Sequence, residues 1–203
     1  PSMPLTAQRF FDFCEKEAPK AEAVFILGDL FEYWVGDDAA THSPFQIEVK
    51  RAIANLSTKT KTYYMHGNRD FLLGAGFAEA SGVRLISDPH VLSTAEWQFV
   101  LSHGDALCLE DEAYQRFRLQ ARDPAWQSDF LSKPLPERLA LAQSMREQSK
   151  AHNQNVAYFA DADLAMTQAW LSAAQSATDA LGCFERRCHG KRRGVSPPTT
   201  EWM

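Results

Sequence analysis

The sequence predicts an α/β fold in which a body of alternating strands and helices carries a helical cap. Between residues 5 and 102, short apolar runs alternate with segments whose apolar residues recur at helical spacing. From residue 111 to about residue 175 the pattern is almost wholly helical, with interruptions at prolines. Alternation followed by a helical block is typical of an α/β body with a helical insertion. A chain of 203 residues is long enough to bury a substantial core.

Three apolar runs in the first half of the chain each end beside a glycine and a polar residue. The runs, with the residues that follow them, are 23–27 with Gly28-Asp29, 63–65 with Gly67-Asn68, and 97–101 with Ser102-His103-Gly104. In open α/β sheets, ligands bind in the crevice outside the carboxyl ends of the strands. We therefore expect Asp29, Asn68 and His103 to form a site.

The first elements follow from apolar spacing and from capping residues. Helical spacing predicts a helix over residues 5–17. The interior of strand 22–28 is continuously apolar, so we expect it to be buried on both faces, as in a parallel sheet. Ser43 and Pro44 are a good cap and first-turn pair for a helix that runs to about Leu56.

Further strands and helices follow the same signals. We expect strands near 61–66, 83–86, 90–93 and 97–102, and a helix from 71 to about 80 that stops at Gly82. Residues 179–181 have the pattern of a strand that is just beginning. After them, residues 182–203 show no periodicity and a basic bias, which predicts disorder.

Composition excludes several classes of protein. A formal net charge of −5 gives no electrostatic basis for binding nucleic acid. The sequence has no run of 18 apolar residues that would predict a transmembrane helix, and its first residues lack the features of an export signal. The four cysteines show no CxxC pairing, which is typical of free thiols in a reducing compartment. These features predict a cytoplasmic protein, and they indicate no protein partner.

The three strand-end residues offer ligands for a metal ion. A carboxylate, an amide oxygen and an imidazole together suit a divalent metal such as manganese. Such a metal polarises phosphoryl oxygens and activates a bound water near neutral pH. In the alternative interpretation, Asp29 and Asn68 belong to ordinary strand-ending turns and His103 is a core histidine. The position of Arg69 beside Asn68 favours a site.

Several motifs resemble those of a known enzyme family. The three short motifs are Gly28-Asp29, Gly67-Asn68-Arg69-Asp70 and Ser102-His103-Gly104-Asp105. They resemble the pattern of calcineurin-like metallophosphoesterases, with Arg69 in place of the usual histidine. The longer phrases at 25–38, 66–74 and 103–118 resemble the UDP-2,3-diacylglucosamine pyrophosphohydrolases of lipid A biosynthesis in Gram-negative bacteria. The resemblance runs from about residue 1 to about residue 180, and it implies a metallophosphoesterase-like sheet sandwich flanked by helices, with a helical cap insertion.

The resemblance also implies roles for particular residues. Asp29 would bridge two manganese ions, and Asn68 and His103 would hold the second of them. Asn68 and Arg69 would contact the substrate phosphates, since a planar guanidinium suits bidentate contact. Asp29, Asn68, His103 and Arg69 are thus the expected catalytic residues.

Further substrate contacts are implied in the helical cap. Asp111 would contact the substrate there. Ser149 and Asn153 match cap positions that contact the nucleotide sugar, and their spacing of four residues places them on one helix face. The implied reaction is hydrolysis of the pyrophosphate bond of UDP-2,3-diacylglucosamine to UMP and 2,3-diacylglucosamine 1-phosphate. The implied location is the cytoplasmic surface of the inner membrane, as a peripheral protein.

Two family motifs are missing from the chain. The family begins with a strand that ends in Asp-x-His and later carries Gly-His-x-His, and neither is present here. We therefore expect an N-terminal truncation and a frameshift near Leu181, with four ligands of the two-metal site not encoded. The expected domains are a truncated core at 1–110, a helical cap at 111–178 and an aberrant tail at 179–203. The alternative functions are an inactive fragment that only binds the nucleotide sugar, and a phosphoesterase for another nucleotide or phosphodiester.

Two groups of cap residues have open interpretations. An apolar stripe either lines a groove for acyl chains or packs the cap helices together; it consists of Phe117, Trp126, Phe130, Leu131, Leu135, Leu139 and Leu141. A set of basic residues either touches anionic lipid headgroups or forms a solvated helix face; it consists of Arg118, Arg122, Lys133 and Arg138.

Overall fold

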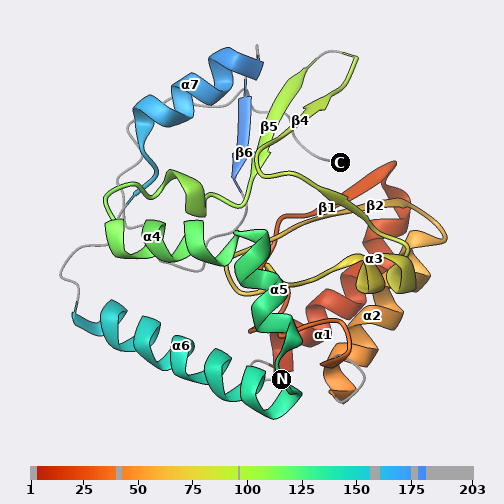
Figure 1. Ribbon diagram of the computed structural model, residues 1–203. Coiled ribbons are helices and arrows are strands. Elements are labelled where there is room, and N and C mark those ends of the chain that lie inside the picture. The colour runs from red at the N-terminus through yellow and green to blue at the C-terminus, as the bar shows by residue number, and fades with distance from the viewer. Residues whose placement is uncertain (1–3, 40–42, 96, 156–160, 175–177, 182–203) are drawn as a thin grey trace.

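The structure of the chain is a computed structural model that describes residues 4–39, 43–95, 97–155, 161–174 and 178–181. Of residues 152–155 and 178–181 it describes the backbone only. The described residues form two three-stranded sheets and a series of helices (Figure 1). This architecture confirms the α/β class.

The first sheet is parallel and brings two of the predicted strand ends together. Its strands are β1 (Ala23–Ile26), β2 (Lys61–Met65) and β3 (Arg84–Ile86), in that order. Phe25 pairs with Tyr63 across β1 and β2, and their rings stack with centroids 4.8 Å apart. Because parallel strands end at the same edge of a sheet, the segments after β1 and β2 are neighbours.

Strand β1 is less buried than its apolar sequence predicts. All four of its residues are half-buried, whereas Thr62, Tyr64 and Met65 of β2 are buried. Among the described strands, β1 lies at the edge of its sheet and has one neighbour. The expectation of burial on both faces is therefore wrong for this strand.

The second sheet consists of β4 (His90–Ser93), β5 (Gln98–Ser102) and β6 (Thr178–Leu181). Strands β4 and β5 are antiparallel, and β5 and β6 are parallel. Residues 179–181, where the sequence shows the beginning of a strand, therefore lie in β6. The rest of the predicted tail, residues 182–203, lies outside the described residues.

Helices near the N-terminus cover the first sheet. The first helical segment consists of α1 (Pro4–Asp12), the π-helical turn η1 (Phe13–Glu17) and the 3-10 turn η2 (Ala18–Lys20). Helix α2 (Pro44–Ser57) starts as predicted, because Ser43 Oγ accepts a hydrogen bond from the Gln46 amide (3.4 Å). In Figure 1, α1 and α2 lie beside α3 (Ala75–Ser81) on one side of the molecule.

Helix α3 begins four residues later than the helix expected from residue 71. Its first turn is capped from the loop after β1: Asp37 Oδ1 accepts from the Gly74 amide (3.0 Å) and Oδ2 from the Phe77 amide (2.9 Å). This carboxylate satisfies amides that a helix start leaves unpaired, so the cap decides the boundary. The helix ends before Gly82, whose φ is 70°, as predicted.

The helical block predicted from residue 111 is confirmed. It follows the 3-10 turn η4 (Asp105–Leu107) and consists of α4 (Glu112–Ala121), α5 (Pro124–Ser132), α6 (Leu135–Asn155) and α7 (Leu164–Ala174). In Figure 1, α4 and α6 lie on the side opposite α1–α3. Among the helices that the structure describes, none combines the length and the apolar character needed to cross a membrane.

The core includes the loop after β1, which is more than a connection. Phe31 and Trp34 of this loop are 2% and 3% exposed, and both rings contact Phe77 of α3. Phe130 and the half-buried Trp126 of α5 pack against the same cluster. The core thus joins α5 to the loop that carries Asp29.

Candidate functional site

Asp29 stands where the end of β1 meets the backbone after β2 and the His103 side chain after β5. Its φ is 54° and that of Gly28 is 87°, in the left-handed region that side chains disfavour. A Cβ on Gly28 would lie 2.5 Å from the Gly67 backbone and 2.9 Å from His103 Nδ1. A Cβ on Gly67 would lie 2.2 Å from Asp29 Oδ1. Only glycine fits at both positions, and this explains the glycine at the end of β1 and of β2.

The Asp29 carboxylate lies between the other two strand ends. Its Oδ1 accepts a hydrogen bond from the Arg69 amide (2.9 Å) and lies 3.7 Å from His103 Nε2. Its Oδ2 lies 3.5 Å from Arg69 Nε. Burial raises the pKa of Asp29, although His103 and Arg69 act in the opposite direction. The structure therefore brings the predicted residues of β1, β2 and β5 together.

Asn68 carries an oxygen that its surroundings leave unsatisfied. In the part of the chain that the structure describes, its Oδ1 is buried and accepts no hydrogen bond. A buried polar atom without a partner costs about 1–3 kcal/mol, and such atoms are rare in native structures. Its neighbours Gly67 and Arg69 have their amides bonded to Asp70 and Asp29, so the turn itself is fixed. The oxygen is thus available to a cation or a hydrogen-bond donor.

His103 is held in one tautomer. It is fully buried, and its Nδ1 lies 2.8 Å from the carbonyl oxygen of Leu27. A carbonyl only accepts, so we infer that Nδ1 carries the proton; in the neutral imidazole, Nε2 on the side of Asp29 then carries the lone pair. A histidine that ligates a metal is usually oriented by a hydrogen bond of this kind.

Asp70 belongs to the short motif, but its role could not be read from the sequence. It is fully buried. Its Oδ2 accepts from the Tyr64 hydroxyl (2.5 Å), the Leu30 amide (2.9 Å) and the Phe31 amide (3.5 Å). Its Oδ1 accepts from the Gly67 amide (2.8 Å). Asp70 therefore ties the loop after β1 to the turn after β2. In the sequence, the signal for this role was an aspartate three residues after the glycine that follows the strand.

Two arginines share one carboxylate beside this cluster. Arg69 Nη1 lies 3.4 Å from Glu32 Oε2, and Arg146 Nη2 of α6 lies 2.5 Å from the same oxygen. Arg146 also donates to the Glu32 carbonyl oxygen. The side chains of Arg69 and Arg146 are 33% and 42% exposed, so both guanidinium groups border solvent. Sequence reasoning identified Arg69 and missed Arg146, because the contact between α6 and this loop is tertiary.

The turn after β5 is held by charges from the cap. Asp105 is fully buried, and Arg118 Nε and the Tyr114 hydroxyl donate to its Oδ2 at 3.0 and 2.5 Å. Burial alone would raise the pKa of Asp105, but Arg118, Tyr114 and nearby positive charge outweigh it and lower the pKa. Ser102 Oγ donates to Asp88 (2.6 Å) and accepts from the amide of the glycine after His103 (3.0 Å).

The predicted cap contacts lie on two separate helices. Asp111 caps α4, because its Oδ1 accepts from the Tyr114 amide (3.0 Å). Ser149 is exposed on α6, and Asn153 lies on the same helix, with its side chain outside the description. The structure gives Asp111 a structural role, and the predicted substrate contacts of these three residues stay predictions.

Most of the basic residues considered for lipid contact are engaged within the protein. Arg138 is 4% exposed and donates to Asp38 and to the Val35 carbonyl oxygen. Arg118 binds Asp105, and Arg122 donates to the Gly67 carbonyl oxygen. These three arginines do not form the solvated or lipid-facing surface that the sequence suggested.

The donors at the strand ends match a divalent cation in type. They are the Asp29 carboxylate, the Asn68 amide oxygen and the His103 Nε2. No group of three or more His, Cys, Asp or Glu side chains is arranged to hold a metal within the described residues. Because one of the three donors is an amide, they fall outside such a group. The three donors fit a divalent cation by type, and they are fewer than a complete site has.

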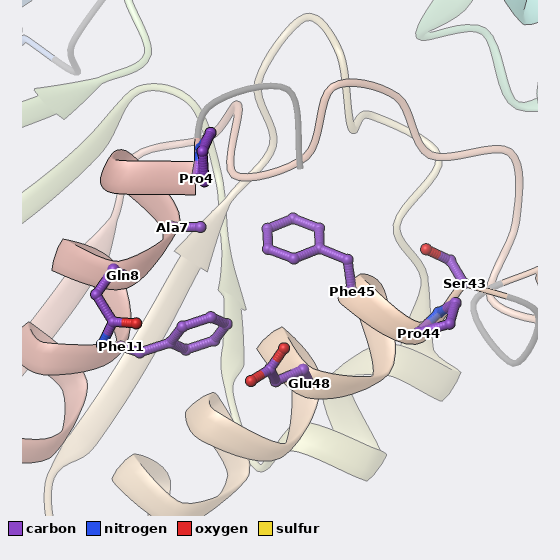
Figure 2. Close-up of a pocket in the computed structure, with 8 residues that line it drawn as sticks. All are labelled: Pro4, Ala7, Gln8, Phe11, Ser43, Pro44, Phe45 and Glu48. Carbon is purple, nitrogen blue, oxygen red and sulfur yellow. The ribbon is translucent and has the colours of Figure 1, made fainter.

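A separate cavity lies between α1 and the start of α2. It has a volume of about 500 Å³, and Figure 2 shows the rings of Phe11 and Phe45 and the carboxylate of Glu48 around it. Its lining does not include Asp29, Asn68 or His103. The candidate site is therefore distinct from this cavity.

No protein-family model matches the chain. Among solved structures, the nuclease MPE of Pseudomonas putida aligns with a TM-score of 0.36 and 18% identity, over 51% of this chain and 48% of that one.

Several curated proteins are more similar to the chain in sequence than this nuclease is. The UDP-2,3-diacylglucosamine hydrolases of Chromobacterium violaceum and Hahella chejuensis are 47% and 48% identical to the chain over 151 and 149 residues. These matches cover 74% and 73% of this chain. The chain spans 63% and 60% of the length of these relatives. The chain is therefore a homologue of the UDP-2,3-diacylglucosamine hydrolases over about three quarters of its own length.

Proposed function

We propose that the chain carries the active-site core of an enzyme that hydrolyses UDP-2,3-diacylglucosamine to UMP and 2,3-diacylglucosamine 1-phosphate. The observation that carries the proposal is the meeting of Asp29, Asn68 and His103 at the strand ends, where Asn68 Oδ1 is buried without a partner. Homology to hydrolases of this name supports the choice of substrate.

Asp29, Asn68 and His103 would hold the metal ion, and Mn²⁺ is the ion we propose. When bound, the ion polarises a phosphoryl oxygen and lowers the pKa of a bound water. His103 contributes a lone pair at Nε2, since Nδ1 is engaged with the Leu27 carbonyl oxygen. Asp70 keeps the two turns at a fixed spacing through four hydrogen bonds.

Arg69 would bind the phosphate groups and stabilise charge that develops on them. Arg69 and Arg146 both contact the Glu32 carboxylate, so two guanidinium groups already converge on one anionic group. A diphosphate presents more oxygens and more charge than a carboxylate, and planar guanidinium groups bind such oxygens in pairs. An anionic substrate is therefore favoured at this edge of the site.

The cap would bind the rest of the substrate. We assign Asp111, Ser149 and Asn153 to the nucleotide sugar. In the apolar stripe, Phe130 and Trp126 pack against the core, whereas Leu131 and Leu139 are 39% and 40% exposed. The two leucines are the available contacts for acyl chains, and a protein that draws this substrate from the inner membrane would sit on its cytoplasmic surface.

An inactive chain that only binds the nucleotide sugar is the second candidate. It is favoured because the strand ends supply three metal donors, which are fewer than a complete metal site has. A phosphoesterase for a soluble nucleotide or phosphodiester is the third. It differs from the first in that its activity would not depend on Leu131 and Leu139.

The test is Mn²⁺-dependent release of UMP from UDP-2,3-diacylglucosamine. The 203-residue chain is compared with a version whose flanking segments are supplied from the Chromobacterium violaceum relative. We expect release by the extended version, and less of it after Leu131→Ser and Leu139→Ser. Binding without release by the extended version would support the second candidate. Release that is indifferent to both leucines would support the third.

A further inference from the structure

Helix α4 and the residue that caps its C-terminus, Arg122, direct three side chains toward the carboxylate of Asp105. Tyr114, Arg118 and Arg122 recur every four residues, so they share one helix face. The Tyr114 hydroxyl and Arg118 Nε donate to Asp105 Oδ2, and Arg122 Nη2 lies 3.9 Å from that oxygen. Asp105 is fully buried, so these contacts fix its position against α4.

Arg122 also reaches the turn after β2. Its Nη2 donates to the carbonyl oxygen of Gly67 (3.1 Å), the residue before Asn68. Asp105 follows His103 by two residues. One guanidinium group therefore joins the turn that carries Asn68 to the turn that carries His103. The bond to Gly67 is charge-assisted, which makes it stronger than a neutral hydrogen bond.

We propose that Arg122 is a positioning residue that holds Asn68 and His103 at the spacing at which they bind a divalent metal ion. This inference rests on the proposed function, because the metal is the ligand whose donors are positioned. Arg122 bonds to Gly67 and approaches Asp105, and it acts on the donors through the two turns. Replacing a residue that orients metal ligands typically weakens metal binding about 10- to 100-fold.

The test compares Arg122→Met with Arg116→Met in the full chain. Methionine keeps much of the apolar length of arginine and removes the guanidinium group. Arg116 lies on the same helix, and its side chain is 72% exposed and paired with Glu112, so Arg116→Met controls for the loss of one positive charge. Arg122→Lys keeps the positive charge and removes the planar guanidinium group. We expect its amide exchange and its affinity for Mn²⁺ to lie between those of the parent and those of Arg122→Met.

The first readout needs no metal. The Arg69 amide donates to Asp29 Oδ1 (2.9 Å), so its hydrogen exchange reports whether the turn after β2 keeps its place. In Arg122→Met we expect this amide to exchange about tenfold faster, while Ile53 in α2 exchanges as in the parent. An unchanged Arg69 rate, or an equal rise at Ile53 from a general loss of stability, would overturn the proposal.

The second readout is the affinity for Mn²⁺, measured by electron paramagnetic resonance on the same proteins. We expect Arg122→Met to bind about tenfold more weakly than the parent or Arg116→Met. Equal affinity would contradict the positioning role. A parent that binds no Mn²⁺ would refute the proposed function, and the exchange rate of the Arg69 amide would then decide whether Arg122 orders the turn.

Discussion

Replacing Asp70 with asparagine tests the claim that one buried carboxylate sets the geometry of the site. Asp70 accepts three hydrogen bonds at Oδ2 and one at Oδ1. An asparagine keeps its oxygen toward the Tyr64 hydroxyl and the two loop amides, and it then turns its NH₂ group toward the Gly67 amide. Two donors face each other there, and both are cut off from water.

The expected loss follows from these contacts. A hydrogen bond to a charged acceptor contributes about 1.5–3 kcal/mol, and a buried donor without a partner costs about 1–3 kcal/mol. We expect Asp70→Asn to lower the free energy of unfolding by about 3 kcal/mol, a large part of the roughly 5–15 kcal/mol of a typical domain. The measurement is urea unfolding followed by circular dichroism.

Tyr64→Phe is the matched control for Asp70→Asn. It removes one of the four donors, the hydroxyl at 2.5 Å, and leaves the carboxylate with three backbone amides. We expect it to cost about 1 kcal/mol, clearly less than Asp70→Asn. If Asp70→Asn cost no more than Tyr64→Phe, the assignment of Asp70 as the link between the two turns would be wrong.

Three further changes test other contacts. Gly67→Ala would put a Cβ 2.2 Å from Asp29 Oδ1, so we expect a loss of about 2 kcal/mol in urea unfolding; an unaffected protein would contradict the close approach. Burial raises the pKa of Cys14 from its usual 9.0 to about 11, so this thiol should make stability fall as pH rises from 9 to 11, and Cys14→Ala should make the fall smaller; parallel pH profiles would refute it. Arg146→Ala should raise the KM for UMP release about tenfold with little change in kcat, whereas an unchanged KM would exclude this guanidinium from phosphate binding.

The part of the site that could be predicted is the part set by local sequence. Asp29 and Asn68 each follow a strand at a glycine, and parallel pairing of β1 and β2 brings them to one edge. His103 follows β5, in the second sheet, and still lies 3.7 Å from Asp29. A short apolar run that ends at a polar residue is enough to place such a side chain, because the strand fixes the path of the backbone and the point at which the polar residue leaves the sheet.

The contacts that support the site could not be predicted in this way. Asp37 caps α3 from the loop after β1, and Arg146 reaches Glu32 from α6, across long stretches of sequence. Arg122 looked like a candidate for a solvated face, but it donates to a backbone carbonyl of the turn after β2. Such pairs have no periodic signal, because they depend on how separate elements pack.

Binding of Mn²⁺ by the chain and by its Asn68→Ala variant tests the central claim most directly. Asn68→Ala removes a buried oxygen that accepts no hydrogen bond within the described part of the chain, so it should not lower the free energy of unfolding, and loss of the unpaired oxygen should raise it by about 1 kcal/mol. We expect the parent to bind Mn²⁺ and the variant to bind at least about tenfold more weakly, as measured by electron paramagnetic resonance at matched protein concentration. Equal binding by both proteins, or no binding by the parent, would contradict a metal site at the strand ends.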